Sequence, residues 1–298
     1  MNAKTTKGSW YKWEVLLLLW MAYLLNQADR QVFNTVLPAI RDALSLTDTS
    51  IGLIATVFNL CYAMMVPLGG WAGDRFSRKW VVTIAILFWS VATMFTGWAT
   101  GLISLIILRS VATGGGEALF GPNYNALLSE YHSDTRSTAM SIVQTAYYIG
   151  VIASGFLAGK IADIWGWEYA FIVFGAVGLL HGLLMVAFLR DKRKLEQTNS
   201  TSNAPAKKVS LLDGFRIIFT TPTVLFVMIG FAGLLFVVAG YLTWMPAYLH
   251  ETFDMKLSDA GFHSMLWTHC FAAVGVIFAG RLADKFGTKR LEWRMYLQ

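Results

Sequence analysis

The chain has 298 residues, of which 56% are apolar and 14% are charged. With a mean hydropathy of +0.52, this composition excludes an ordinary soluble domain and favours a protein whose solvent is lipid. The net charge of +6 does not indicate nucleic-acid binding, because the basic residues lie in short stretches between apolar segments. The two cysteines, Cys61 and Cys270, lie inside apolar segments, so the sequence predicts no disulfide framework and no metal site.

Eight apolar segments reach the length of roughly 20 residues that a helix needs to cross about 30 Å of hydrocarbon. Continuous runs of this length, without two-residue alternation, exclude a membrane barrel, so we predict an all-α membrane protein. The predicted spans are residues 13–38, 50–72, 79–99, 101–128, 137–160, 167–189, 222–248 and 259–283.

Lysine and arginine residues fall mostly on one side of the predicted membrane. With the amino terminus in the cytoplasm, 19 of the 24 basic residues lie in cytoplasmic segments and three lie in outer loops. Because Lys and Arg accumulate on the cytoplasmic side, we predict a multi-pass protein of the cell (inner) membrane with both termini in the cytoplasm.

The segment between the sixth and seventh spans is polar and charged, which is typical of a flexible linker. We therefore predict three parts. These are a six-helix transmembrane bundle over residues 1–189, a cytoplasmic linker over residues 190–221, and a partial second bundle of two helices and a tail over residues 222–298.

A short motif that follows the second span returns 210 residues later, at the end of the eighth span. Each copy has a glycine, an aspartate four residues later, a basic residue beside it and a further basic pair. An ordered recurrence of this kind indicates a duplicated membrane protein. The first copy comprises Gly70, Asp74, Arg75, Arg78 and Lys79, and the second comprises Gly280, Asp284, Lys285, Lys289 and Arg290.

Four charged residues lie inside predicted spans: Asp29 and Arg30 in the first, and Arg109 and Glu117 in the fourth. Each costs about 2.5 to 3.5 kcal/mol in a membrane when it is unpaired, so each needs a partner or a wet pathway. Neighbours in sequence point about 100° apart on a helix, so Asp29 and Arg30 satisfy one another poorly. We therefore expect each of them to find a partner elsewhere, and the fourth span contains a residue of each charge.

Two six-helix bundles joined by a basic loop, with the repeated motif after the second helix of each bundle, resemble the major facilitator superfamily. The Asp29-Arg30 pair and the run Arg109-Ser-Val-Ala-Thr-Gly-Gly-Gly-Glu117-Ala resemble the anion:cation symporters (hexuronate and galactonate carriers) and the related Spinster-like lysolipid carriers. The resemblance implies the major facilitator fold. Members have twelve spans, so we expect this chain to be truncated or frameshifted after the eighth, with a complete first bundle and the first two helices of the second.

The resemblance also implies secondary active transport by alternating access, with proton-coupled symport of a small organic anion such as a sugar acid or sugar phosphate. Glu117, and secondarily Asp29, would exchange protons. Arg30 would attract the substrate anion, and Arg109, Tyr62 and Gln144 would complete its binding site. The residues of the repeated motif would latch the helices on the cytoplasmic side.

The usual spacing between the arginine and the glutamate of the fourth helix is seven residues in that family, and here it is eight. In a regular α-helix, seven residues leave two side chains about 20° apart, whereas eight turn them about 80° apart. We therefore expect Arg109 and Glu117 not to act together directly.

Several alternatives stay open. The charges of the first and fourth spans could form a permanent structural ion pair, and the motif could be a solvated basic turn that only fixes topology. The chain could carry a lysolipid or another hydrophobic solute, or it could be a fragment that does not transport. An enzyme is not predicted, because no phosphate-binding loop, zinc-binding helix or nucleophile elbow occurs. We expect no cofactor, and the partners expected are the anionic substrate, protons and the lipid bilayer.

Overall fold

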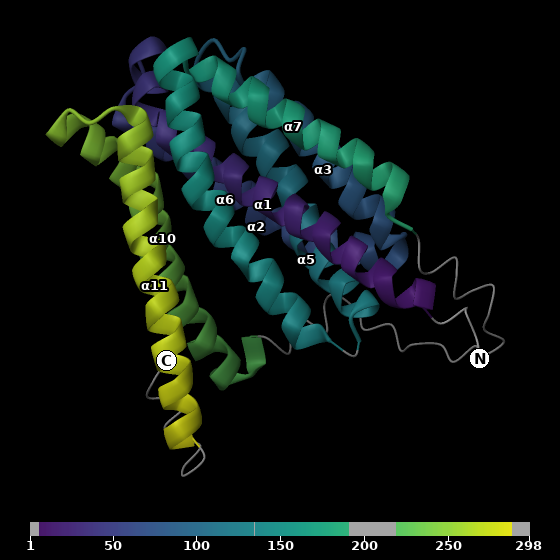
Figure 1. The fold of residues 1–298 in the computed structure, drawn as a ribbon. Helices are drawn as coiled ribbons and strands as arrows, with labels where there is room; N and C mark the ends of the chain where they lie inside the picture. Colours follow the sequence, from purple (N-terminus) through teal and green to yellow (C-terminus); the bar gives the residue numbers. More distant parts are fainter. Residues whose placement is uncertain (1–5, 134, 191–218, 288–298) are drawn as a thin grey trace.

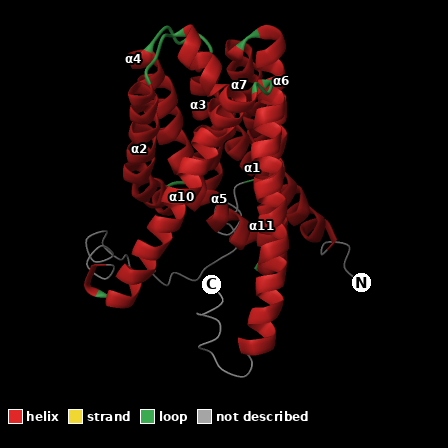
Figure 2. Ribbon diagram, turned by 90° about the vertical axis from the view of Figure 1, so that its left-hand side faces the viewer, coloured by secondary structure: helices red, strands yellow, loops and turns green. Residues whose placement is uncertain are grey.

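The computed structural model describes residues 6–133, 135–190 and 219–287. Within these ranges the chain is helical and contains no strand, which confirms the predicted all-α class (Figures 1 and 2). The elements are α1 (Thr6–Ala43), α2 (Asp48–Arg75), α3 (Arg78–Thr96), α4 (Leu102–Leu105), η1 (Ile106–Thr113), α5 (Gly114–Tyr131), α6 (Arg136–Trp165), α7 (Trp167–Phe188), α10 (Pro222–Phe253) and α11 (Leu257–Gly287).

Each predicted span coincides with a helix, and the fourth is built from α4, the π-helical segment η1 and α5 in direct succession. Six helical stretches of the described chain are long and apolar enough to cross a membrane: Asp48–Arg75, Arg78–Thr96, Leu102–Tyr131, Thr138–Trp165, Trp167–Phe188 and Pro222–Phe253. α1 and α11 are not among these six, although both are helical over the predicted spans. Residues 191–218 of the predicted linker and the tail from residue 288 lie outside the described residues.

Helix ends are set by local sequence. Thr47 caps α2, since its hydroxyl oxygen accepts a hydrogen bond from the backbone N–H of Ser50 at 3.2 Å. Gly166 separates α6 from α7 with a φ of 107°, a conformation that costs other residues energy. Pro222 stands in the first turn of α10, where its missing N–H removes no helical hydrogen bond.

Glycines let the first bundle pack closely. A Cβ on Gly175 of α7 would lie only 2.5 Å from the backbone nitrogen of Met94 in α3. A Cβ on Gly73 of α2 would lie 1.6 Å from the side-chain oxygen of Asn123 in α5. Asn123 donates at 2.8 Å to the carbonyl of Gly69, so this asparagine joins α2 and α5.

The last two helices lie against the first bundle through α11, which runs alongside α6 (Figure 1). A Cβ on Gly155 of α6 would lie 2.7 Å from the carbonyl oxygen of Gly261 in α11. A Cβ on Gly261 would in turn lie 2.7 Å from the methyl carbon of Thr35 in α1. Three helices therefore meet here with no space for a side chain.

Polar contacts close the same end of the interface, which we call the Arg41 end. Both carboxylate oxygens of Asp163 in α6 accept from backbone N–H groups in the first turn of α11, from Leu257 at 3.3 Å and Ser258 at 3.1 Å. A helix amino terminus favours a negative charge because its first N–H groups are unpaired. Arg41 of α1 forms an ion pair at 2.9 Å with Glu251 of α10. The two helix groups are therefore tied together at this end.

Replacing Gly155 with leucine tests this contact. The new side chain has to displace the backbone of α11, so we expect a loss of about 1 to 3 kcal/mol of stability. Gly230→Leu is the matched control, because no atom lies within 4 Å of a Cβ built on Gly230 of α10. Thermal unfolding in detergent measures both. Equal unfolding midpoints in the two variants would contradict the packing described here.

Candidate functional site

The four charged residues predicted inside the membrane lie in one polar layer between two apolar clusters. One cluster includes Leu19 of α1 and Phe120 of α5, and the other includes Phe33 of α1 and Leu105 of α4. In α1 and in the fourth span, the charged residues lie in the stretch of sequence between the residues of the two clusters. The sequence thus brings charge to the middle of the bundle and apolar packing to either side of it.

Arg30 of α1 is paired with Glu117 of α5. The Nε of Arg30 donates to Oε2 of Glu117 at 2.6 Å, a short charge-assisted hydrogen bond. The Glu117 side chain is fully buried, whereas the Arg30 side chain is 31% exposed. The guanidinium carbon of Arg30 lies 4.5 Å from the ring centre of Tyr62. This cation–π contact restricts the orientation of the guanidinium in addition to the ion pair with Glu117.

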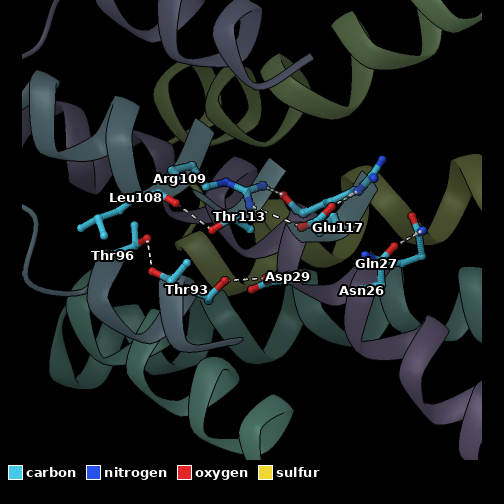
Figure 3. A network of polar contacts seen from close by, with 11 residues as sticks. Asn26, Gln27, Asp29, Thr93, Thr96, Leu108, Arg109, Thr113 and Glu117 are labelled. Carbon is cyan, nitrogen blue, oxygen red and sulfur yellow. Dashed lines mark hydrogen bonds and ion pairs between the residues drawn. The ribbon is translucent and has the colours of Figure 1, made fainter. Parts of the chain in front are cut away.

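Arg109 of η1 is buried beside this pair. Its guanidinium carbon lies 4.8 Å from the ring centre of Phe58 and 5.4 Å from that of Phe33. One terminal nitrogen donates to the carbonyl of Arg30 at 3.4 Å, and the other is 3.8 Å from Oε1 of Glu117 (Figure 3). Glu117 therefore stands between two arginines.

The closeness of Arg109 and Glu117 contradicts the expectation that a spacing of eight residues keeps them apart. The reason is the π-helical segment Ile106–Thr113, which contains Arg109 and extends from it toward Glu117 as far as Thr113. A π turn is closed by an i→i+5 bond and holds one residue more than an α turn. One π turn therefore gives a spacing of eight residues nearly the same angular separation as a spacing of seven in a regular α-helix. The side chain of Thr113 agrees with this spacing, since its hydroxyl donates at 2.9 Å to the carbonyl of Leu108, five residues earlier.

Asp29 is hydrogen-bonded to α3 and not to Arg30. Its Oδ2 accepts a hydrogen bond from the hydroxyl of Thr93 at 2.5 Å, and the residue is 5% exposed (Figure 3). Asp29 also lies within electrostatic reach of Glu117, Arg109 and, more weakly, Arg30. The expectation that Asp29 and Arg30 find different partners is met: Arg30 pairs with the fourth span, as suggested, and Asp29 bonds to the third.

The uncharged residues proposed for a substrate site are placed differently from one another. Tyr62 of α2 lies over Arg30 and stacks on Phe58 with ring centres 6.3 Å apart. Gln144 is exposed on α6, and its side chain makes no hydrogen bond with the described part of the chain. The structure brings Tyr62 to the charged layer and leaves Gln144 without a contact to it.

The first copy of the repeated motif forms contacts between helices of the first bundle. Arg78 is 3.2 Å from Asp74 and also pairs with Glu130 at the end of α5. Lys79 donates at 3.0 Å to the carbonyl of Val186 in α7. These contacts join α2, α3, α5 and α7 at the opposite end from Arg41, which we call the Arg78 end.

The other residues of the repeated motif make no hydrogen bond or ion pair between helices in the described part of the structure. Arg75 lies over the ring of Trp71, and a Cβ on Gly70 would meet no atom within 4 Å. In the second copy, Gly280, Asp284 and Lys285 belong to α11, but their side chains are outside the described part of the structure. Lys289 and Arg290 lie outside the described residues altogether.

Four residues of these networks were missed from the sequence: Phe33, Phe58, Thr93 and Glu130. The aromatic rings and Thr93 are ordinary residues of apolar spans, and only the fold brings them to charged groups. Glu130 had a usable signal, since it is an acid on the same membrane side as the basic motif. Within the described ranges, no group of three His, Cys, Asp or Glu residues could hold a metal ion.

The sequence profile described as "Major Facilitator Superfamily" matches residues 19–297. The "Hexuronate transporter" of Bacillus subtilis (strain 168) is 30% identical, over 92% of this chain and 64% of its own length. "Protein spinster homolog 1" of Homo sapiens is 30% identical, over 79% of this chain and 45% of its own length.

Among solved structures, a bacterial homolog to the human lysosomal transporter Spinster, in an inward-facing and unoccupied conformation, has a TM-score of 0.77 and 26% identity. This match covers 94% of the chain and 64% of the solved one. The chain therefore spans less than two thirds of the length of these relatives.

Deleting Ala112, within the π turn, tests its role. The deletion restores the spacing of seven that a regular α-helix needs to hold Arg109 and Glu117 about 20° apart. We expect a folded protein with an unfolding midpoint close to that of the wild type, measured in detergent.

Deleting Ala126 is the matched control, because α5 is regular there. The deletion turns Leu127, Leu128 and Glu130 about 100° away from their contacts, and each buried leucine that is lost costs about 2 to 5 kcal/mol. We expect this variant to be strongly destabilised. Similar stability of the two deletions would contradict the special role of η1.

Proposed function

Since the chain belongs to the Major Facilitator Superfamily, we propose that it is part of a secondary active transporter that moves a small organic anion together with protons. The observation that carries this proposal is the buried Glu117 held by the partly exposed Arg30. The name of the hexuronate transporter among the relatives supports a carboxylate substrate.

Arg30 is the proposed anion-binding residue. Its pair with Glu117 uses Nε, and the planar guanidinium has further N–H donors that match a carboxylate bidentately. The rings of Tyr62 and Phe58 lie on it at 4.5 and 5.6 Å and restrict its orientation. A substrate carboxylate would therefore compete with Glu117 for the same group.

Glu117 is the proposed proton acceptor, and charge balance gives the reason. The layer holds two arginines and two carboxylates, so its formal charge is zero when all four are ionised. An entering anion would add a negative charge in a region of low dielectric, where an unbalanced charge is costly. Uptake of one proton would restore the balance. Glu117 is the carboxylate that loses part of its partner when Arg30 turns to the substrate.

Asp29 is the secondary candidate for the proton. Its hydrogen bond from Thr93 does not involve Arg30, so anion binding at Arg30 would disturb Asp29 less than it disturbs Glu117. Arg109 is proposed to hold the layer together and to add positive potential, because it is buried between two rings and reaches both Arg30 and Glu117.

Alternating access is proposed to work between the first bundle and the helices α10 and α11. The contacts at the Arg41 end would open in one half of the cycle. At the other end, the Arg78 network would latch the helices of the first bundle to one another, so that the bundle moves as one body. We propose that the Arg78 end faces the cytoplasm of a cell membrane, because the basic residues Arg75, Arg78, Lys79 and Arg190 gather there.

Proton uptake on anion binding tests the proposal. When D-glucuronate is added to the purified chain in weak buffer, we expect about one proton to be taken up for each anion bound, measured as a pH change beside calorimetric binding. Glu117→Gln should still bind the anion but take up almost no proton, and Arg30→Gln should lose binding.

The control is Glu14→Gln, which replaces an exposed carboxylate near the start of α1 and should behave as the wild type. If Glu117→Gln takes up as many protons as the wild type, the assignment of Glu117 is wrong. If the wild type binds no anion, the proposed function fails for this chain.

A further inference from the structure

α11 brings a histidine to the first bundle that the proposed mechanism does not use. His269 is 6% exposed, and its ring lies against the rings of Tyr147 and Tyr148 in α6, with centres 5.5 and 5.8 Å apart. The helix that lies outside the six-helix bundle therefore adds a polar ring to its surface.

His269 and Arg30 lie at comparable distances along their helices from one shared contact. Gly261 of α11 meets Thr35 of α1 near the Arg41 end. From this contact, Arg30 lies five residues further along α1 and His269 eight residues further along α11, both toward the Arg78 end. At a rise of 1.5 Å per residue, these are distances along the helix axes of about 7.5 and 12 Å, which differ by less than one helical turn. Tyr147, which touches His269, lies within electrostatic reach of Arg30.

The hydrogen bond of His269 fixes which ring nitrogen carries the proton. Nδ1 is 2.8 Å from the carbonyl oxygen of Met265, and a carbonyl only accepts, so Nδ1 is the donor. Among the described residues, the ring contacts of His269 are tyrosine rings, and no carboxylate is paired with it there to offset a buried imidazolium, so the neutral ring is favoured. Nε2 then presents a lone pair and acts as an acceptor.

The Nε2 atom of His269 has no hydrogen-bond partner in the described part of the chain and is not fully enclosed there. A carboxylate has no hydrogen to give to such an acceptor. A hydroxyl group has one.

We propose that His269 is a specificity-determining residue, whose Nε2 accepts a hydrogen bond from a hydroxyl group of the anion that Arg30 binds by its carboxylate. This inference rests on the proposed function and narrows its substrate to organic anions that carry a hydroxyl group. Such a substrate would touch α1 at one end and α11 at the other, and so would join the two helix groups.

A cycle of substrate and protein changes tests the contact. D-gluconate and its monodeoxy analogues, each lacking one hydroxyl, are titrated calorimetrically into the wild type and into His269→Phe, which keeps an aromatic ring without the acceptor. In the wild type, we expect one analogue to bind about three- to tenfold more weakly than D-gluconate, the effect of one net hydrogen bond. In His269→Phe, that difference should vanish, because the partner of the hydroxyl is gone.

His269→Gln is the rescue variant, since its amide oxygen provides an acceptor near the position of Nε2, and it should restore the difference. Equal weakening of every ligand in His269→Phe, or an unchanged difference, would overturn the role of His269. Arg30→Gln separates the two proposals. If it loses D-gluconate while His269→Phe keeps the full pattern, the anion site stands and this inference falls. If the wild type itself does not distinguish D-gluconate from its analogues, the hydroxylated substrate class is wrong.

Discussion

The structure depends on the balance of four charges inside an apolar bundle. Arg30 and Glu117 form a short ion pair between α1 and α5, while Arg109 lies against the same carboxylate. Removing one member of such a buried group leaves another charge without a partner, which costs about 3 to 5 kcal/mol. The same sensitivity makes the layer responsive, because an entering anion changes the balance that holds it. On the proposed mechanism, stability and coupling are two consequences of one arrangement.

The rest of the fold supports this layer by close helix packing. Without a hydrophobic force between helices in lipid, association relies on van der Waals contact and on hydrogen bonds between helices. Glycines at Gly73, Gly155 and Gly175 provide the contact, and Asn123 provides a hydrogen bond. At the Arg41 end, Asp163 caps a helix of the other group rather than its own. That contact is confined to helix ends, so it can be broken without disturbing the charged layer.

Much of the architecture could be predicted from the sequence, because span length and charge are nearly independent of tertiary detail. The eight helical segments and the partner of Arg30 follow from the cost of polar groups in lipid. The contact of Arg109 with Glu117 could not be predicted, because helical-wheel reasoning assumes a constant period and η1 breaks it. The bond of Asp29 to Thr93 was missed for another reason: one threonine in an apolar span has no pattern that marks it.

The residues of the site were also predictable from the sequence only in part. Charged residues were identified because each requires an explanation, whereas uncharged candidates rested on resemblance, and Tyr62 reached the layer while Gln144 did not. His269 is a residue for which the sequence alone suggested no role at the site. A lone histidine in a span is usually a hydrogen-bonding group between helices, and only the contact of Nδ1 with Met265 identifies Nε2 as the acceptor nitrogen.

The most direct measurement of the central claim is the protonation state of Glu117 with and without a bound anion. Infrared difference spectra of the chain, recorded as D-glucuronate binds, report the C=O stretch of a neutral carboxylic acid. The account predicts that this band appears on binding and is absent from Glu117→Gln. A spectrum without the band, or with the same band in Glu117→Gln, would contradict it.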